Sequence, residues 1–534
     1  MARRRLDLWL VKNRGKILLA LVFLIAFGLR FYHLNINPPG LYVDEVSIGY
    51  NAYSILKTGY DEHGQFFPLW FQAFGEYKLP VYIYLTAIAE LIFGVNELAV
   101  RFPSAFFGFL TVVAYYFLVK ELLPRFSLDK YIFAASLLAV SPWHLHFSRA
   151  GFEANLALFF VTLATLLFVL AIKKKKLSLM LLSLINFVLS FYTYNAYRLF
   201  TPLLIVALFA IYRKQLKKFV FRQLILVLIL AVLISLPFLK FSFSPEGLVR
   251  AQAESFFSQV EVSGEAPLFS RTYLYLTQFF KNYLSYFSFD FLFFAGDQNG
   301  RHSVRKMGEL YLWQLPFLLV GFYLLLRKGD KQRAYFKKIA ASWLFLSPLA
   351  ASFTKVNPHA LRALMMVIPL QSIIFLGFLA FFQAIKKKLW RRGILFLVLL
   401  LAFYNLAGYL HLYWVHYPQK TFIDWAYGYK QLFAATGSLE NRYEKIVINN
   451  HRRRETYLFF LFYQKYDPWK NLASQTNDSF PPYYFTEGFP LDLGKGKGKF
   501  LYAALAHEEL PPEGLLKEIR YPDGGIVYRL YEPK

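Results

Sequence analysis

Apolar stretches of about 17 to 25 residues recur along most of the chain, and short clusters of lysine and arginine separate them. A membrane-spanning helix needs roughly 20 apolar residues, whereas a strand of a membrane barrel needs about 10. The stretches are too long for barrel strands, so the pattern predicts a polytopic α-helical membrane protein.

The basic clusters set the order of the spans, because lysine and arginine favour cytoplasmic loops. If every cluster faces the cytoplasm, eleven spans fit between and around them, the N-terminus is cytoplasmic, and the chain after residue 411 emerges outside. The first span follows MARRR without a small-residue cleavage site, so we expect it to be retained. The predicted spans are residues 17–33, 97–119, 131–144, 153–172, 177–194, 199–212, 221–240, 309–327, 339–353, 361–385 and 393–411.

One further segment, residues 79–95, is apolar enough to cross the membrane. A crossing there would place every later basic cluster on the opposite side, so we expect an interfacial or re-entrant helix instead. Residues 1–411 then form a membrane domain with two large outer loops, 34–96 and 241–308.

The pattern changes after residue 411, where short segments replace the long apolar ones. KIVINN and KFLYAAL predict strands, RRETYLFFLFYQKY predicts a helix, and LLKEIRYPDGGIVYRLYE predicts a hairpin that turns at Pro-Asp-Gly-Gly. Residues 412–534 therefore predict a small α/β domain outside the membrane.

The composition agrees with a chain embedded in a lipid bilayer: 57% of the residues are hydrophobic and the mean hydropathy is +0.36. The net charge of +27 would suggest nucleic acid as the partner of a soluble protein, but here the basic residues lie between the spans. We therefore expect a cell-membrane protein that binds no nucleic acid. The absence of cysteine excludes disulfides and thiolate metal sites.

Two adjacent acids, Asp44 and Glu45, follow NPPG just beyond the first span. A carboxylate within hydrocarbon costs roughly 2.5–3.5 kcal/mol, and an acid near that depth is usually functional. The alternative is that both acids lie in the first turn of a helix and stabilise its positive end. Because neighbouring helical residues diverge by about 100°, we expect one acid to carry chemistry while the other caps the helix.

Cations gather at the predicted outer ends of later spans, beside aromatic and imidazole groups. A single cation there is commonly an anchor that reaches the interface, but several at one depth would suit an anionic lipid headgroup. The candidates are Arg149, Arg198, His359 and Arg362, with Glu76 and Lys78 in the first outer loop.

Several stretches resemble a known family: PPGLYVDEVSIGYNAYSILKTGYDEHGQ, FGEYKLPVYIYL, FGVNELAVRFPSAFFG, FSRAGFEAN and NPHALRAL. They are similar to bacterial glycosyltransferases of the GT-C superfamily, nearest to the dolichyl-phosphate-mannose protein mannosyltransferase-like enzymes of family 39 and more distantly to the aminoarabinose lipid A transferases. The resemblance runs over about residues 15 to 410 and is most specific in the first 110. It implies transfer of a sugar from a polyprenyl-phosphate carrier on the outer face, an essential acid at Asp44 beside Glu45, and a lysine near the donor phosphate at Lys78.

The residues then suggest an inverting mechanism in which Asp44 accepts the proton of an acceptor hydroxyl as it attacks the anomeric carbon. Lys78, Arg149 and Arg362 would stabilise the departing polyprenyl phosphate. Further substrate contacts are expected from Tyr42, Tyr50, Tyr77, Glu76, Arg198 and His359.

The sequence leaves the sugar open, with mannose or a similar hexose or pentose as the family-level expectation, and the acceptor is a protein, a lipid or a glycan. No metal site is predicted, although a divalent cation between Asp44 and Glu76 stays open as a cofactor. Two other functions share the polytopic plan: a lipid-linked oligosaccharide ligase or polymerase, and a transporter of lipid carriers without transferase activity.

Overall fold

The computed structural model describes residues 2–73, 75–217, 219, 221–258, 268–328, 333–451, 455–474, 479–489, 499–508 and 513–532. Contacts divide the chain into two compact units. Unit 1 contains Met1–Tyr32 and Ser104–Leu412, and unit 2 contains His33–Pro103 and Tyr413–Lys534. The first outer loop is therefore grouped with the C-terminal residues, whereas the sequence placed it with the membrane domain.

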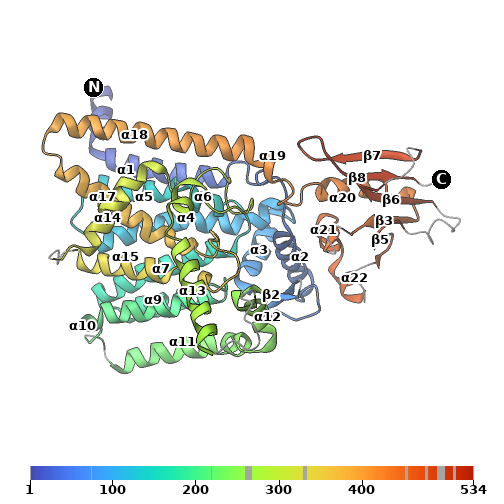
Figure 1. Ribbon diagram of the computed structural model, residues 1–534, viewed down its shortest axis with the longest axis horizontal. Helices are drawn as coiled ribbons and strands as arrows, with labels where there is room; N and C mark the ends of the chain where they lie inside the picture. Colours follow the sequence, from blue (N-terminus) through green and yellow to red (C-terminus); the bar gives the residue numbers. More distant parts are fainter. Residues whose placement is uncertain are drawn as a thin grey trace. The chain divides into compact units, whose positions relative to one another are not determined.

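Unit 1 is a bundle of helices, most of which run roughly along one direction (Figure 1). Each of the eleven predicted spans overlaps a helix. A single segment in lipid can satisfy its backbone hydrogen bonds only as a helix, so long apolar runs favour this structure. These helices are α1 (Ala2–Phe31), α4 (Glu97–Leu122, which begins in unit 2), α5 (Leu128–Ala139), α7 (Glu153–Lys174), α8 (Leu177–Phe191), α9 (Tyr197–Ile211), α11 (Phe221–Ser242), α14 (Leu315–Leu326), α15 (Ala334–Leu346), α17 (Val367–Ala384) and α18 (Lys388–His411).

Four helices among the described residues are long and apolar enough to cross a membrane, namely Glu97–Leu122, Glu153–Lys174, Leu364–Ala384 and Lys388–Thr421. A fifth candidate is the bent pair Ile229–Ser242 and Pro245–Glu254. The total of eleven spans stays a prediction, because several of the other helices are short. The segment predicted as interfacial or re-entrant forms the 14-residue helix α3 (Pro80–Phe93), which is among these shorter apolar helices.

Further elements, all of them short except the 18-residue helix α13, connect these helices of unit 1 and build the loops at their ends. They are α6 (Pro142–Phe147), α10 (Arg213–Leu216), α12 (Pro245–Glu254), η1 (Phe256–Ser258), α13 (Leu268–Ser285), η2 (Asp290–Phe294), η3 (Leu312–Gln314), α16 (Leu349–Ser352) and η4 (Leu364–Met366).

Unit 2 joins the first outer loop to the C-terminal region through helix packing. Helix α2 (Val43–Thr58) packs against α3 and against α21 (Thr456–Tyr463). A two-stranded hairpin, β1 (Phe71–Ala73) and β2 (Glu76–Lys78), lies between α2 and α3 in the chain.

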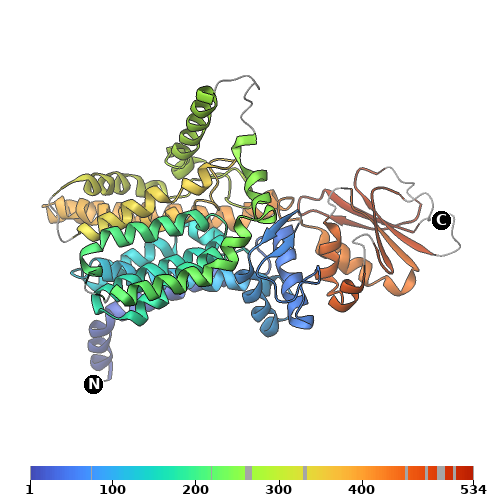
Figure 2. The ribbon, with the colours of Figure 1, turned by 90° about the horizontal axis from the view of Figure 1, so that it is seen from below.

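The C-terminal region contains a six-stranded sheet in the order β4-β5-β3-β6-β8-β7, in which β3 runs parallel to both of its neighbours. The predicted strands, helix and hairpin are all present at the expected places. In Figure 2 the orange helices of this region lie along one side of the red-brown strands. The remaining elements of unit 2 are η5 (Leu412–His416), α19 (Tyr417–Thr421), α20 (Tyr429–Gly437), η6 (Glu440–Arg442), α22 (Pro468–Ala473), β3 (Lys445–Asn449), β4 (Ser479–Phe480), β5 (Tyr483–Thr486), β6 (Phe500–Leu505), β7 (Leu515–Arg520) and β8 (Ile526–Tyr531).

Candidate functional site

An ion pair in unit 2 joins Asp44, in the first turn of α2, to Lys78 at the end of β2. The β1–β2 register places Lys78 opposite Phe71, and strand alternation puts Glu76 on the same face of the hairpin as Lys78. Lys78 is 3% exposed and Asp44 is 31% exposed. The pair thus presents a partly exposed carboxylate that a buried ammonium holds in place.

The second acid, Glu45, points elsewhere and is fully buried against Arg101. The Arg101 Nε atom donates to Glu45 Oε1 at 2.9 Å, and Nη2 donates to Oε2 at 3.2 Å. The backbone amide of Tyr42 also donates to Glu45 Oε2, at 3.4 Å, at the start of α2. The two side chains therefore point in different directions, as helix geometry predicts. Glu45 caps the N-terminus of α2, and Asp44 stays partly exposed.

Arg101 was not singled out in the sequence, although it lies in the quoted stretch FGVNELAVRFPSAFFG. Besides Glu45, its guanidinium donates to the backbone carbonyls of Leu34, Pro38 and Gly40. The signal that could have found it is an arginine inside an apolar helical run, because such a residue nearly always has a buried partner.

A third carboxyl, Glu62, is buried in the loop after α2 and was not among the predicted site residues. The Asn51 amide donates to Glu62 Oε1 at 2.8 Å, and the Glu62 backbone amide donates to Asn51 Oδ1 at 3.0 Å. Burial raises the pKa of Glu62 to about 8, with a smaller upward effect from Asp61, while the Asn51 hydrogen bond and the charge of Lys78 act in the opposite direction. Glu62 is therefore mostly protonated at neutral pH.

The predicted aromatic contacts differ in exposure. Tyr42 and Tyr50 are buried, the first with its ring 5.4 Å from that of Trp425 and the second with its hydroxyl donating to the Tyr466 carbonyl at 3.3 Å. Tyr77 is only half-buried, on β2. Of the three, Tyr77 has the ring that a substrate can reach in this structure.

Arg149, in unit 1, is buried at the C-terminal end of α1. Its Nη1 atom donates to the Leu29 carbonyl at 2.7 Å and to the Arg30 carbonyl at 3.2 Å, and its Nη2 atom donates to the Tyr32 carbonyl at 2.7 Å. The last carbonyls of a helix have no partner within the helix, so these bonds make Arg149 a cap for α1.

Two other predicted cations, Arg198 and Arg362, line a cavity of about 710 Å³ in unit 1 whose surface is mostly apolar. The Arg362 Nη2 atom donates to Glu254 Oε2 at 2.6 Å, while its Nη1 atom is buried without a hydrogen-bond partner among the described residues. The Arg198 guanidinium lies 4.5 Å from the centre of the Phe238 ring. The cavity combines an apolar wall with guanidinium groups, which suits a lipid with an anionic part.

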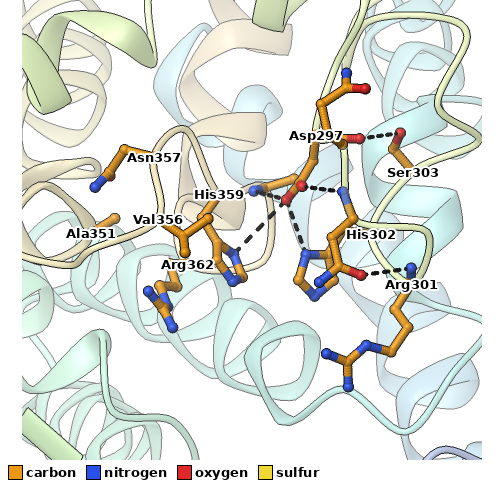
Figure 3. Close-up of polar contacts among 12 residues, drawn as sticks. Asp297, Arg301, His302, Ser303, Ala351, Val356, Asn357, His359 and Arg362 are labelled. Carbon is orange, nitrogen blue, oxygen red and sulfur yellow. Dashed lines mark hydrogen bonds and ion pairs between the residues drawn. The ribbon is translucent and has the colours of Figure 1, made fainter. Parts of the chain in front are cut away.

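Asp297, His302 and His359 form a buried cluster (Figure 3). One of its members, His359, lies three residues before Arg362 in the chain. Asp297 Oδ2 lies 3.0 Å from His302 Nδ1 and 4.0 Å from His359 Nδ1, and it accepts a hydrogen bond from the Ala360 amide at 2.8 Å. Burial alone would raise the pKa of Asp297, but the His302 hydrogen bond, the nearby His302 and His359 imidazoles and the Asn299 amide lower it to about 2. Burial lowers the pKa of His302.

Of this cluster the sequence singled out only His359, as a substrate contact. The available signal for the other two was the polar run GDQNGRHS in the second outer loop, where an acid and a histidine lie five positions apart. That run carries no indication of a partner 57 residues further along the chain, so a tertiary structure is needed to see the cluster.

Comparisons with known proteins agree on the fold. The sequence profile of the dolichyl-phosphate-mannose-protein mannosyltransferase family matches residues 78–239. ArnT from Cupriavidus metallidurans matches in its apo state with a TM-score of 0.53 at 12% identity, over 98% of this chain and 100% of ArnT. This chain has the fold of the GT-C glycosyltransferases.

Two further structures share the GT-C fold. ArnT bound to undecaprenyl phosphate matches with a TM-score of 0.53 at 11% identity, again over 98% of this chain and 100% of ArnT. The Archaeoglobus fulgidus oligosaccharyltransferase matches with a TM-score of 0.52 at 16% identity, over 85% of this chain. This chain covers 64% of that enzyme, which is less than two thirds of its length. No curated protein sequence matches significantly.

The shared fold confirms the resemblance found in the sequence, and the structure itself shows the expected apolar helices and the C-terminal sheet.

Proposed function

We propose that this chain is a membrane glycosyltransferase that moves a sugar from a polyprenyl-phosphate carrier to an acceptor hydroxyl on the outer face of the membrane. The mannosyltransferase profile over residues 78–239 supports a transferase, and the ArnT structure with undecaprenyl phosphate supports a polyprenyl phosphate as carrier. The archaeal oligosaccharyltransferase is likewise found with a dolichol-phosphate and an inhibitory peptide.

The observation that carries the proposal is the Asp44–Lys78 ion pair. A general base must be ionised, and the adjacent ammonium favours the ionised form of a carboxyl. A phosphate needs a cation, and Lys78 supplies one within reach of that base. The ion pair therefore supports a proposal in which Asp44 acts as the base and Lys78 binds the phosphate.

In the proposed step, the acceptor hydroxyl gives its proton to Asp44 while its oxygen bonds to the anomeric carbon. The bond between that carbon and the phosphate oxygen breaks, the electron pair stays on the polyprenyl phosphate, and the configuration inverts. Lys78 stabilises the charge that grows on the phosphate as the bond breaks. Because Lys78 already balances the Asp44 carboxylate, the step uses no divalent cation at Asp44 and Glu76.

The other residues of the sequence-based hypothesis take different parts in this proposal. Tyr77 and Glu76, both half-buried on β2, are proposed to contact the sugar. Arg362 and Arg198 are proposed to hold an anionic part of a lipid substrate in the cavity of unit 1. Arg149 is proposed to act through the end of α1 that it caps, without touching the substrate.

The test uses purified protein and a panel of radiolabelled polyprenyl-phosphate sugars, beginning with mannose because the matching family transfers mannose. We expect consumption of one donor with release of polyprenyl phosphate. Asp44→Asn should lower that rate by roughly 10²–10⁴, the usual contribution of a general base. Asp129→Asn, which changes an exposed acid on α5 in the same way, should leave the rate unchanged.

Near-normal turnover by the Asp44→Asn protein would remove Asp44 as the base. A different result would be that the wild-type protein consumes no donor and moves the intact lipid-linked sugar across the membrane of proteoliposomes. That result would favour the alternative function, a transporter of lipid carriers without transferase activity.

A further inference from the structure

The buried cluster of Asp297, His302 and His359 has no part in the proposed transfer step. It joins two segments of unit 1 that are far apart in the chain: the loop between η2 and η3, and the loop before η4. One carboxylate oxygen and two imidazole nitrogens of these residues lie within 4.8 Å of one another.

We propose that Asp297, His302 and His359 form a binding site for a divalent transition-metal ion of the zinc class, which links the second outer loop to the loop before α17. In Figure 3 the two imidazole rings lie side by side and both present a nitrogen to the Asp297 carboxylate. Two imidazoles and one carboxylate are a common ligand set for zinc, whereas magnesium and calcium prefer oxygen alone.

The distances fit a metal at the centre of the three groups. With bonds of about 2.0–2.2 Å, the ligand atoms of a tetrahedral zinc ion are separated by roughly 3.3 Å. The two measured separations from Asp297 Oδ2, 3.0 Å to His302 Nδ1 and 4.0 Å to His359 Nδ1, lie on either side of this value. The two imidazole nitrogens lie within 4.8 Å of each other, so the three groups surround a space that an ion of this kind would occupy after side-chain adjustment.

His359 supplies an independent observation that points to a ligand. It is 9% exposed, and its Nδ1 atom is buried without a hydrogen-bond partner among the described residues. A buried polar atom is costly unless it is paired, and a metal ion between His359 and Asp297 would pair it.

The surrounding hydrogen bonds hold the carboxylate in a fixed orientation, as outer-shell groups do around metal ligands. The Asn299 amide donates to Asp297 Oδ1 at 2.8 Å, and the Ala360 amide donates to Oδ2 at 2.8 Å. The nearby Arg362 would repel a cation, but its ion pair with Glu254 offsets its charge.

Three protein ligands leave the fourth position of a tetrahedral ion open. That position would take water or an oxygen of an anionic ligand. Since His359 lies three residues before the cavity-lining Arg362, a bound ion would also fix this part of the cavity wall.

The test measures zinc binding directly, so it does not depend on the transferase activity. Full-length protein in detergent is stripped with a chelator, desalted and titrated with ZnCl₂ by calorimetry, and its zinc content is then measured by elemental analysis. We expect one zinc ion per chain for the wild-type protein. His302→Gln and His359→Gln should each weaken binding by at least about 100-fold.

His451→Gln is the matched control, because it removes an exposed imidazole from unit 2. It should bind zinc as the wild-type protein does. His359→Gln is the more informative ligand variant, since the Nδ1 atom that it removes makes no hydrogen bond among the described residues and the metal-free protein should melt at an unchanged temperature. Zinc should then raise the melting temperature of the wild-type protein and leave that of His359→Gln unchanged.

The proposal is overturned if the wild-type protein binds no zinc under these conditions, or if both ligand variants bind it as tightly as the wild type. An inactive transferase that still binds one zinc through these residues would separate the failure of the proposed function from that of the metal site.

Discussion

At the scale of single residues, we expect the buried Glu45–Arg101 pair to stabilise the fold more than the neighbouring Asp44–Lys78 pair does. Asp44 carries the proposed chemistry. Glu45 and Arg101 are both 0% exposed, and removing one member of a buried ion pair leaves the other charged and unpaired. We expect Arg101→Met to lower the free energy of unfolding by roughly 3–5 kcal/mol, measured by chemical denaturation in detergent.

The matched comparison is Lys499→Met, which removes the partner of Glu532 in a pair whose side chains are 77% and 37% exposed. A pair of this kind contributes about 0–1 kcal/mol. Equal losses for the two variants would show that Arg101 does not stabilise unit 2 through Glu45.

Glu62 provides the residue-scale prediction on pH. Its pKa is raised to about 8 in the folded protein from an ordinary value of 4.5, so the folded state keeps a proton that the unfolded state releases. Stability should therefore fall as the pH rises from about 4.5 to about 8, by about 1.4 kcal/mol for each pKa unit of difference, and level off above that range. Glu62→Gln keeps an oxygen that accepts the Asn51 hydrogen bond but removes the titrating carboxyl, so it should flatten this part of the pH–stability curve. The same slope in both proteins would rule out Glu62 as the source of the pH dependence.

At the scale of elements, Gly49 lies where α2 packs tightly against neighbouring helices of unit 2. A Cβ atom on Gly49 would lie 2.4 Å from the Phe462 ring of α21 and 2.9 Å from Val100. Gly49→Ala should therefore destabilise the protein by about 1–3 kcal/mol, seen as a lower melting temperature in detergent. Gly393→Ala in α18 adds the same methyl group where nothing lies within 4 Å, so it should be neutral or stabilising.

The coupling between Gly49 and Phe462 is measurable in a double-mutant cycle. Phe462→Ala makes room for the new methyl group, so the loss from Gly49→Ala should shrink in that background. Additive losses would place the strain elsewhere in α2.

The elements were largely predictable, because each is encoded in consecutive residues. Long apolar runs and basic clusters located the helices of unit 1, and the Pro-Asp-Gly-Gly turn located the hairpin of β7 and β8. The site was predictable only where neighbouring residues define it, as for Asp44 and Glu45. Glu45 meets Arg101 across 56 positions, and no local periodicity encodes such a contact.

At the scale of the whole molecule, the two units are not consecutive in the chain, since unit 2 combines residues 33–103 with residues 413–534. The loop that carries Asp44 thus obtains part of its core from the C-terminal region: α2 packs on α21 and α22, and the Asn37 amide donates to the Tyr413 carbonyl at 2.8 Å.

Removing residues 413–534 should expose the apolar face of α2 and raise hydrogen exchange of its amides throughout Val43–Thr58. The amides of α7, in unit 1, are the internal reference and should keep their protection. If α2 kept its protection in the truncated protein, the first outer loop would fold without the C-terminal region. That region would then not be needed to stabilise α2, and acceptor binding would be the role left to test.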